Sequence, residues 1–179
     1  SDQHQTNIEP TSRRHPNNII FAVEETLVRL ADLDEPERSH LGEVPCPSFD
    51  TQPWVSGPPL KERRVAMIPP AALQHRDDTP FVIGTGDYRV IADDTPARDL
   101  VMSHISTNFD RSGFEQDLNV VLPLDRLHEM AEAGEIGSVA RFHYAFMGST
   151  DPVQMEDAAR AMAGLLQADG VDSCILIPV

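Results

Sequence analysis

The segment 151–179 constrains the fold more than any other part of the chain, because a well-marked helix leads there into a strand-like run. Asp151 suits a helix N-cap, Pro152 fits the first helical position, and Gln154 completes a capping box. Apolar residues follow at helical spacing until Gly170 ends the helix: Met155, Ala158, Ala159, Met162, Leu165 and Leu166. The next residues, VDSCILIPV, are typical of a fully buried strand. A helix that feeds a buried strand indicates an α/β fold.

Short apolar runs earlier in the chain extend this pattern. We predict strands or extended segments at four places, namely 65–68 (VAMI), 88–92 (YRVIA), 100–105 (LVMSHI) and 119–123 (NVVLP). A helix is predicted from Leu124, and 136–148 is interpreted as a strand followed by a loop. Strands that alternate with helices predict a three-layer α/β sandwich with a mostly parallel, Rossmann-like sheet.

The first 60 residues have a different character. Residues 1–16 are polar and aperiodic, whereas 17–33 show helical spacing and 34–60 are rich in proline. We therefore predict an N-terminal helical arm over 1–60, with a disordered start, one helix and a Pro-rich loop. The α/β domain is predicted to occupy 61–179.

The formal net charge of −15 excludes several function classes. Nucleic acids and anionic membrane surfaces are bound by clustered Lys and Arg, so neither is an expected partner. No run approaches the roughly 18 apolar residues of a membrane span, and no signal peptide is visible, so we predict an acidic cytoplasmic protein. Cys46 and Cys174 match no zinc or disulfide-framework spacing, and Cys174, inside an apolar run, is interpreted as a buried, inert thiol.

The block 103–148 holds the candidate functional residues, because polar side chains cluster there at the ends of predicted elements. Ligands of open parallel sheets bind outside the carboxyl ends of the strands. We expect the loop after 100–105, the end of 119–123, the segment 143–149 and the end of the chain to meet at that edge. The catalytic candidates are His104, Asp110, His143 and Tyr144. The substrate-binding candidates are Thr107, Arg111, Asn119 and Met147.

Each candidate also has a structural interpretation. Either histidine can act as a general acid or base, or can be hydrogen-bonded within a structural network. Asp110 and Arg111 can orient a substrate carboxylate or pair with each other. Asn119 also suits a cap, while Tyr144 and Met147 also suit the core. No HxH or HExxH spacing supports a metal site, and the sequence identifies no cofactor.

Several segments, in order, resemble a known family. They are PLKERRVAMIPPAAL (59–73), PF..GDYRVI (80–91), SHISTNFDR (103–111), DLNVVLPLDRLHEMAEAGEIGSVARFHYAFMG (117–148) and LLQADGVDSCILIPV (165–179). Over about 53–179 the chain resembles the selenoprotein B-type subunits of glycine, sarcosine and betaine reductases, and the related D-proline reductase subunit. The resemblance implies reductive cleavage of a C–N bond in an amino-acid-like substrate by a selenocysteine or cysteine. That residue is expected shortly after the strand at 171–179, a place that Cys174 does not match.

Three functions follow from these observations. The first is a reductase-type enzyme, or enzyme subunit, that acts on a small amino-acid-like or related nitrogenous substrate. The second is a non-catalytic partner or small-ligand binding subunit without the redox centre. The third is a metal-dependent enzyme with new chemistry on the same scaffold. Since the last predicted strand has no following helix to cover it, we also expect a homo-oligomer or a hetero-oligomer with a second subunit.

Overall fold

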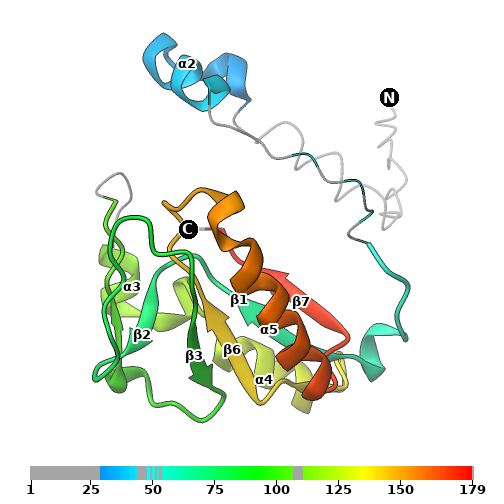
Figure 1. Cartoon of the computed structure of the whole chain (residues 1–179). Helices are drawn as coiled ribbons and strands as arrows, with labels where there is room; N and C mark the ends of the chain where they lie inside the picture. Colours follow the sequence, from blue (N-terminus) through cyan, green and yellow to red (C-terminus); the bar gives the residue numbers. More distant parts are fainter. Residues whose placement is uncertain are drawn as a thin grey trace, which may run out of the picture. The chain divides into compact units, whose positions relative to one another are not determined.

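The computed structural model describes residues 29–43, 48, 50, 52, 54–106 and 111–178 (Figure 1). These residues belong to two compact units, one within 1–46 and one within 47–179. In the smaller unit, η1 (Leu30–Asp32) precedes α2 (Glu35–Glu43), so a helix forms where we predicted part of a loop. Pro36 permits this helix because it lies in the first turn, where no backbone N–H is needed. The helix predicted over 17–33 lies largely outside the described residues.

The larger unit alternates short strands with helices, as the sequence predicts. Its elements are η2 (Leu60–Glu62), β1 (Arg64–Ile68), β2 (Leu73–His75), β3 (Arg89–Ala92), η3 (Ala97–Asp99), β4 (Leu100–Met102), α3 (Ser112–Gln116), η4 (Leu118–Val120), α4 (Leu124–Glu132), β5 (Ser138–Val139), β6 (Phe142–Ala145), η5 (Pro152–Met155), α5 (Glu156–Ala168) and β7 (Ser173–Leu176). In the described part of the chain, no helix is long and apolar enough to cross a membrane.

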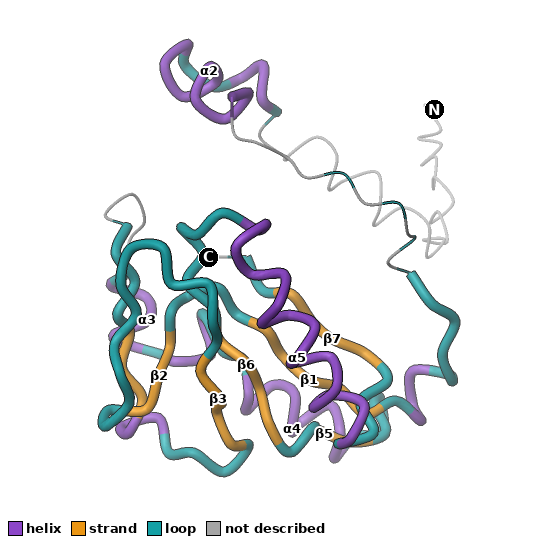
Figure 2. Tube along the Cα trace, in the orientation of Figure 1, coloured by secondary structure: helices purple, strands orange, loops and turns teal. Residues whose placement is uncertain are grey.

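The strands form one parallel group and two antiparallel pairs. β1 lies between β5 and β7 and is parallel to both, whereas β3 pairs with β6 and β2 with β4 in antiparallel fashion. Figure 2 shows β6 between β3 and β1, so the β3–β6 pair lies beside the parallel group. The mixed α/β class is thus confirmed, but the parallel part is confined to three strands.

A seam along β1 joins the parallel group to β6. The backbone N–H of Ala140 donates to Val65 O at 2.8 Å, and farther along, Phe146 N donates to Pro69 O at 3.0 Å. Between these two bonds, the backbone of β6 pairs with β3. The segment that follows β5 therefore bonds to β1 at both ends and to β3 in its middle.

Each face of the sheet has its own apolar cluster, because side chains alternate along a strand. Val65 and Met67 of β1 pack in one cluster with Leu124 and Leu127 of α4. Tyr144 and Phe146 pack in a second cluster, with Met162 of α5 and with Ile68, which is partly buried. In Figure 1, α5 accordingly lies in front of the sheet and α4 behind it.

The helix predicted after Asp151 is confirmed. The Asp151 carboxylate accepts the backbone N–H of Val153 at 3.0 Å, Pro152 begins the first turn, and Gly170 ends the helix at a φ of +69°. Of the predicted stripe, Met162 is buried, but Leu165 is 45% exposed.

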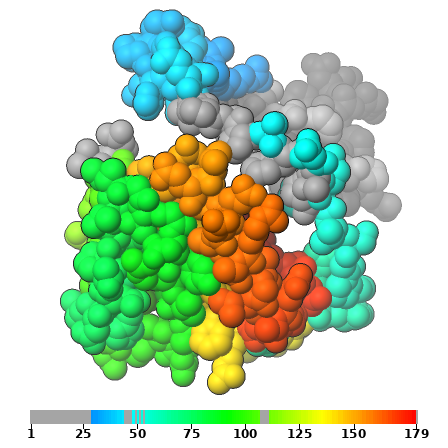
Figure 3. Space-filling view, in the orientation of Figure 1, coloured from blue at the N-terminus to red at the C-terminus, as the bar shows by residue number. Residues whose placement is uncertain are grey.

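Two strand predictions need correction. The residues 119–123 do not form a strand, because Asp117 caps the 3-10 turn η4 and Asn119 bonds to Asp117 and Asp125. Such local side-chain bonds compete with strand pairing. β7 is a strand, but it is not fully buried: it is the outer strand of its sheet, and Leu176 is 73% exposed. Cys174 is exposed for the same reason, so the prediction of a buried thiol is wrong. Figure 3 shows β7 uncovered beside α5.

Candidate functional site

Three loops meet where β1 ends. Pro70 follows β1, His104 follows β4, and Gly148 follows β6, and its backbone N–H donates to Pro70 O at 2.8 Å. A Cβ atom on Gly148 would lie 3.0 Å from both the O and the Cβ atoms of Pro70, and 3.4 Å from His104 Nε2. Any larger residue at this position would push its neighbours apart by a few tenths of an ångström, whereas glycine fits without displacement. Pro70, His104, Gly148 and Arg111, which is bonded to His104, are called the rim below.

The hydrogen bonds around His104 determine which tautomer its imidazole ring adopts. Its Nδ1 accepts the backbone N–H of Ser106 at 3.1 Å, so the neutral ring carries its proton on Nε2, the atom near Gly148. Arg111 Nη2 donates to the carbonyl oxygens of His104, at 2.6 Å, and of Ser106. Burial and the nearby Arg111 charge both lower the pKa of His104, which is only 7% exposed. The rim therefore contains a neutral imidazole whose Nε2 lies on the side of Gly148, in a loop whose backbone is bound by the Arg111 guanidinium group.

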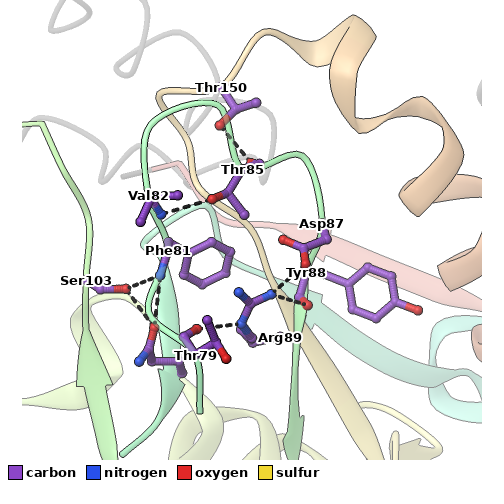
Figure 4. A network of polar contacts seen from close by, with 10 residues as sticks. Thr79, Phe81, Val82, Thr85, Asp87, Tyr88, Arg89, Ser103 and Thr150 are labelled. Carbon is purple, nitrogen blue, oxygen red and sulfur yellow. Dashed lines mark hydrogen bonds and ion pairs between the residues drawn. The ribbon is translucent and has the colours of Figure 1, made fainter.

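A polar network supports the rim from the adjacent loop, residues 79–88 (Figure 4). Ser103, the neighbour of His104, accepts the backbone N–H of Phe81 at 3.0 Å and donates to Gln74 Oε1 at 2.7 Å. At the other end of the loop, Thr150 Oγ1 donates to Thr85 O at 2.9 Å. Phe81 also packs against Met147. The loop is thus tied to the two segments that carry His104 and Gly148.

His143 belongs to a different part of the fold. It is fully buried, and its Nδ1 accepts the backbone N–H of Met67 at 3.0 Å. Its Nε2 faces Asp93 Oδ1 at 3.6 Å, and the same oxygen lies 2.9 Å from Nε2 of His128. Burial, the largest cause, lowers the pKa of His143, although Asp93 opposes this effect. These contacts hold the His143 side chain in the seam between β1 and β6.

The other candidates are distributed as follows. Tyr144 is 2% exposed and makes an edge contact with Tyr88, and Met147 is fully buried. The Asn119 side chain bonds to Asp117 and Asp125 at the start of α4. Thr107 and Asp110 lie outside the described residues. The structure thus brings together His104 and Arg111 among the predicted residues.

Sequence reasoning missed Pro70 and Gly148, although both carried a signal. A Pro-Pro pair directly follows the first apolar run, and a glycine directly follows HYAFM. Within the described ranges, no group of three or more His, Cys, Asp or Glu side chains is arranged to hold a metal ion.

The larger unit is thus a mixed α/β domain with a polar rim at the carboxyl end of a parallel strand, where such domains bind small ligands. The family model for glycine/sarcosine/betaine reductase selenoprotein B matches residues 86–178. The chain belongs to this family.

Two curated relatives are similar over more of the chain. The D-proline reductase subunit gamma of Acetoanaerobium sticklandii is 28% identical over 120 residues, which are 65% of this chain and 49% of that protein. The glycine reductase complex component B subunit gamma of Carboxydothermus hydrogenoformans is 30% identical over 146 residues, which are 75% of this chain and 32% of that protein. The chain thus spans about half of one relative and a third of the other. No solved structure matches it.

Proposed function

We propose that this chain forms part of a subunit of a reductase complex that acts on a small amino-acid-like or related nitrogenous substrate. The family match over residues 86–178 carries the proposal. The names of both relatives support it, since one is a D-proline reductase subunit and the other a subunit of a glycine reductase complex component. Assembly with further subunits is part of the proposal.

The rim is the proposed substrate-facing site. The rim holds a hydrogen-bond donor, the Nε2–H of the neutral His104 ring, and a positive charge, the guanidinium group of Arg111. A donor beside a guanidinium group suits a substrate carboxylate. In this role Arg111 also orders the loop, because it binds the carbonyl oxygens of His104 and Ser106.

The position of β7 supports the same site. β1 and β7 are parallel, and the backbone N–H of Ile177, just after β7, donates to Ile68 O at the end of β1. Both strands therefore end at the edge of the sheet that carries Pro70. A redox Cys or selenocysteine shortly after this strand, as the family resemblance implies, would emerge at that edge. Cys174, which pairs with Ala66 inside the strand, does not occupy that place.

The three-layer, Rossmann-like arrangement also belongs to this proposal. Its support is the location of α4 and α5, which pack in the apolar clusters of opposite sheet faces. The exposed Ile175 and Leu176 of β7 leave one edge of the sheet for further structure, either from the same polypeptide or from a partner.

The test is turnover by the intact reductase complex purified with His104→Ala or Arg111→Gln in this subunit. We expect His104→Ala to lower kcat/KM for glycine, sarcosine, betaine or D-proline by about tenfold or more, through loss of a charge-assisted hydrogen bond. Matched controls are His75→Ala and Arg126→Gln, whose side chains are exposed, and these should retain activity.

The possible outcomes separate the proposed roles. Full activity of both rim variants would contradict the rim as the substrate site. Stable complex formation with no reductase activity in the wild type would instead favour the non-catalytic subunit.

A further inference from the structure

Three large apolar side chains next to the rim are exposed to solvent. Val82 and Ile83, in the loop 79–88, are 63% and 84% exposed, and Val153 of η5 is 62% exposed. Single apolar residues are ordinary on a protein surface, whereas a group of them marks an interaction site. Val82, Ile83 and Val153 are called the apolar tip below.

The two segments that carry the apolar tip are in direct contact. Thr150 Oγ1 donates to Thr85 O at 2.9 Å. A Cβ atom on Gly86 would lie 2.3 Å from the backbone oxygen of Gln154, the residue after Val153. The backbone of the loop thus lies against the backbone of η5, an approach that a side chain at position 86 would prevent. The exposed side chains of the loop and of η5 therefore belong to neighbouring segments of one surface.

Hydrogen bonds hold the turn that presents Val82 and Ile83. Thr85 N donates to Val82 O at 3.0 Å, and Val82 N donates to Thr85 Oγ1 at 2.9 Å (Figure 4). At the base of the loop, Arg89 Nε donates to Thr79 O at 2.9 Å. Both the turn and the base of the loop are thus closed. An apolar surface that is already ordered loses little conformational entropy when a partner binds.

The charges around the apolar tip are acidic. The loop 79–88 and the segment 146–157 together contain four acidic residues and no Lys or Arg. The basic residues that follow, Arg89 and Arg160, are each paired with an acid of these segments. An apolar surface with an acidic border fits a protein surface that has an apolar pocket bordered by Lys or Arg. The same border opposes contact with anionic lipid headgroups.

The apolar tip lies beside the rim. The backbone N–H of Phe81, which precedes the tip, donates to the hydroxyl of Ser103, the neighbour of His104. On the other side, Thr150 follows Gly148 by two residues. A partner that covers the tip would therefore lie next to the rim.

We propose that the apolar tip docks another subunit of the reductase complex, through an apolar pocket on that subunit bordered by Lys or Arg. Ile83, the most exposed of the three side chains, enters the pocket, and Asp151 faces the basic border. The inference rests on the proposed function, because that function supplies the partner.

The Kd between this subunit and the remaining subunits of the complex tests the surface. Ile83→Ser should raise the Kd about tenfold or more, because a few buried anchors carry most of the energy of an interface. The matched control is Leu60→Ser in η2, which precedes β1 at the opposite end from the rim; Leu60 is 54% exposed, and its loss should leave the Kd unchanged. Thermal unfolding of both variants verifies that they fold. A wild-type Kd in the double variant Ile83→Ser, Val153→Ser would overturn the proposal, as would an equal loss in Leu60→Ser.

The charge of the border has its own test. Asp151→Asn keeps a good N-cap for η5 and removes one negative charge. It should raise the Kd about two- to fivefold at low salt, and the difference should vanish near about 0.5 M NaCl. The control Glu132→Gln, in α4 on the other face of the sheet, should bind like the wild type. Unchanged or tighter binding of Asp151→Asn at low salt would overturn a basic border on the partner.

Two further outcomes separate the alternatives. Flotation of the wild type with vesicles of phosphatidylcholine and phosphatidylglycerol, lost in Ile83→Ser, would replace the protein partner by a lipid surface and overturn the proposal. Wild-type assembly and turnover in Ile83→Ser, with turnover lost in His104→Ala, would overturn this inference and leave the proposed function standing. Weakened assembly in Ile83→Ser with full turnover in both rim variants would support the docking surface and contradict the rim.

Discussion

The Nδ1 atom of His143 accepts the backbone N–H of Met67 at 3.0 Å, so an imidazole takes the place of a strand-to-strand hydrogen bond. Backbone bonds from Ala140 to Val65 and from Phe146 to Pro69 stand on either side of it. A buried N–H group needs such an acceptor, because an unsatisfied donor in the core is costly. His143 therefore stabilises the junction between the parallel and antiparallel parts of the sheet.

Truncation of this side chain should destabilise the fold. His143→Ala leaves the Met67 N–H without its acceptor and creates a cavity, so we expect a loss of about 2–4 kcal/mol in the free energy of unfolding. His143→Asn, whose side-chain oxygen can accept the same bond, should lose less. Urea denaturation measures both, with the exposed His75→Ala as the control. An equal effect of His143→Ala and His75→Ala would rule out the bridging role.

The same histidine should make stability depend on pH. Burial lowers the pKa of His143 below its ordinary value of 6.5, against the opposing charges of Asp93 and Asp169 and with a smaller lowering by His128. The unfolded chain then binds more protons between the two pKa values, so stability is complete above about pH 7 and falls as pH drops through 6.5. The buried His104, whose pKa is also lowered, adds in the same direction.

Urea unfolding between about pH 7.5 and 5.5 measures this dependence. We expect His143→Asn to reduce the slope of unfolding free energy against pH. A slope that is the same in wild type and variant would show that His143 titrates alike in both states.

Glycine substitutions test the close approach at the rim. Gly148→Ala places a Cβ 3.0 Å from Pro70 and 3.4 Å from His104 Nε2, so it should displace the rim and reduce activity of the complex. Gly164→Ala in α5 meets nothing within 4 Å and should stabilise the chain by about 0.5–1 kcal/mol. Thermal unfolding and turnover of the two variants make a matched pair. Wild-type turnover in Gly148→Ala would argue against the rim as a site.

Asp169 should contribute to stability through its bonds to both arginines. Burial alone would raise its pKa, but hydrogen bonds from the Arg64 side chain and from the Arg141 and Phe142 backbone lower it overall. Asp169→Asn should therefore cost about 1–3 kcal/mol at neutral pH, measured by urea denaturation against Asp157→Asn. Since the pKa of Asp169 is lowered, this contribution is complete above its ordinary value of 3.8 and is lost as pH falls through the folded pKa.

Cys174 should be accessible but slow to react. The residue is exposed, yet partial burial of its thiol raises the pKa above 9.0 and reduces the thiolate fraction at neutral pH. Iodoacetamide should modify it in the folded chain, with a rate that rises steadily above pH 8, as peptide mass spectrometry can follow. Rapid modification at pH 7 would contradict the raised pKa.

Local signals in the sequence predicted the elements that depend on local contacts. The predictions of the capped helix after Asp151 and of a strand at 65–68 were correct because a cap, a glycine stop and an apolar run act within a few residues. The run 119–123 failed because Asn119 bonds to Asp117 and Asp125, a choice that apolar content does not reveal. The exposure of β7 depends on which strands flank it, and spacing alone does not determine that.

The candidate site, like the fold, could be predicted only in part from the sequence. His104 and Arg111 were found because polar residues follow a predicted strand. Tyr144 and Met147 lie in the same block of sequence but point into the apolar clusters, as alternation along β6 and the loop after it requires. The roles of Gly148 and Asp169 arise from contacts with residues far away in the sequence, so only the folded chain shows them.

The segment from Arg141 to Gly148 is attached at several points along its length. Its first residue bonds to Asp169, its centre is fixed to β1 through His143, and its last residue bonds to Pro70 at the rim. Bonds therefore hold this short segment at its start through Asp169, at its centre through His143 and at its end through Pro70. His143 is thus the central attachment of a segment that runs along β1 from one end of the sheet to the other.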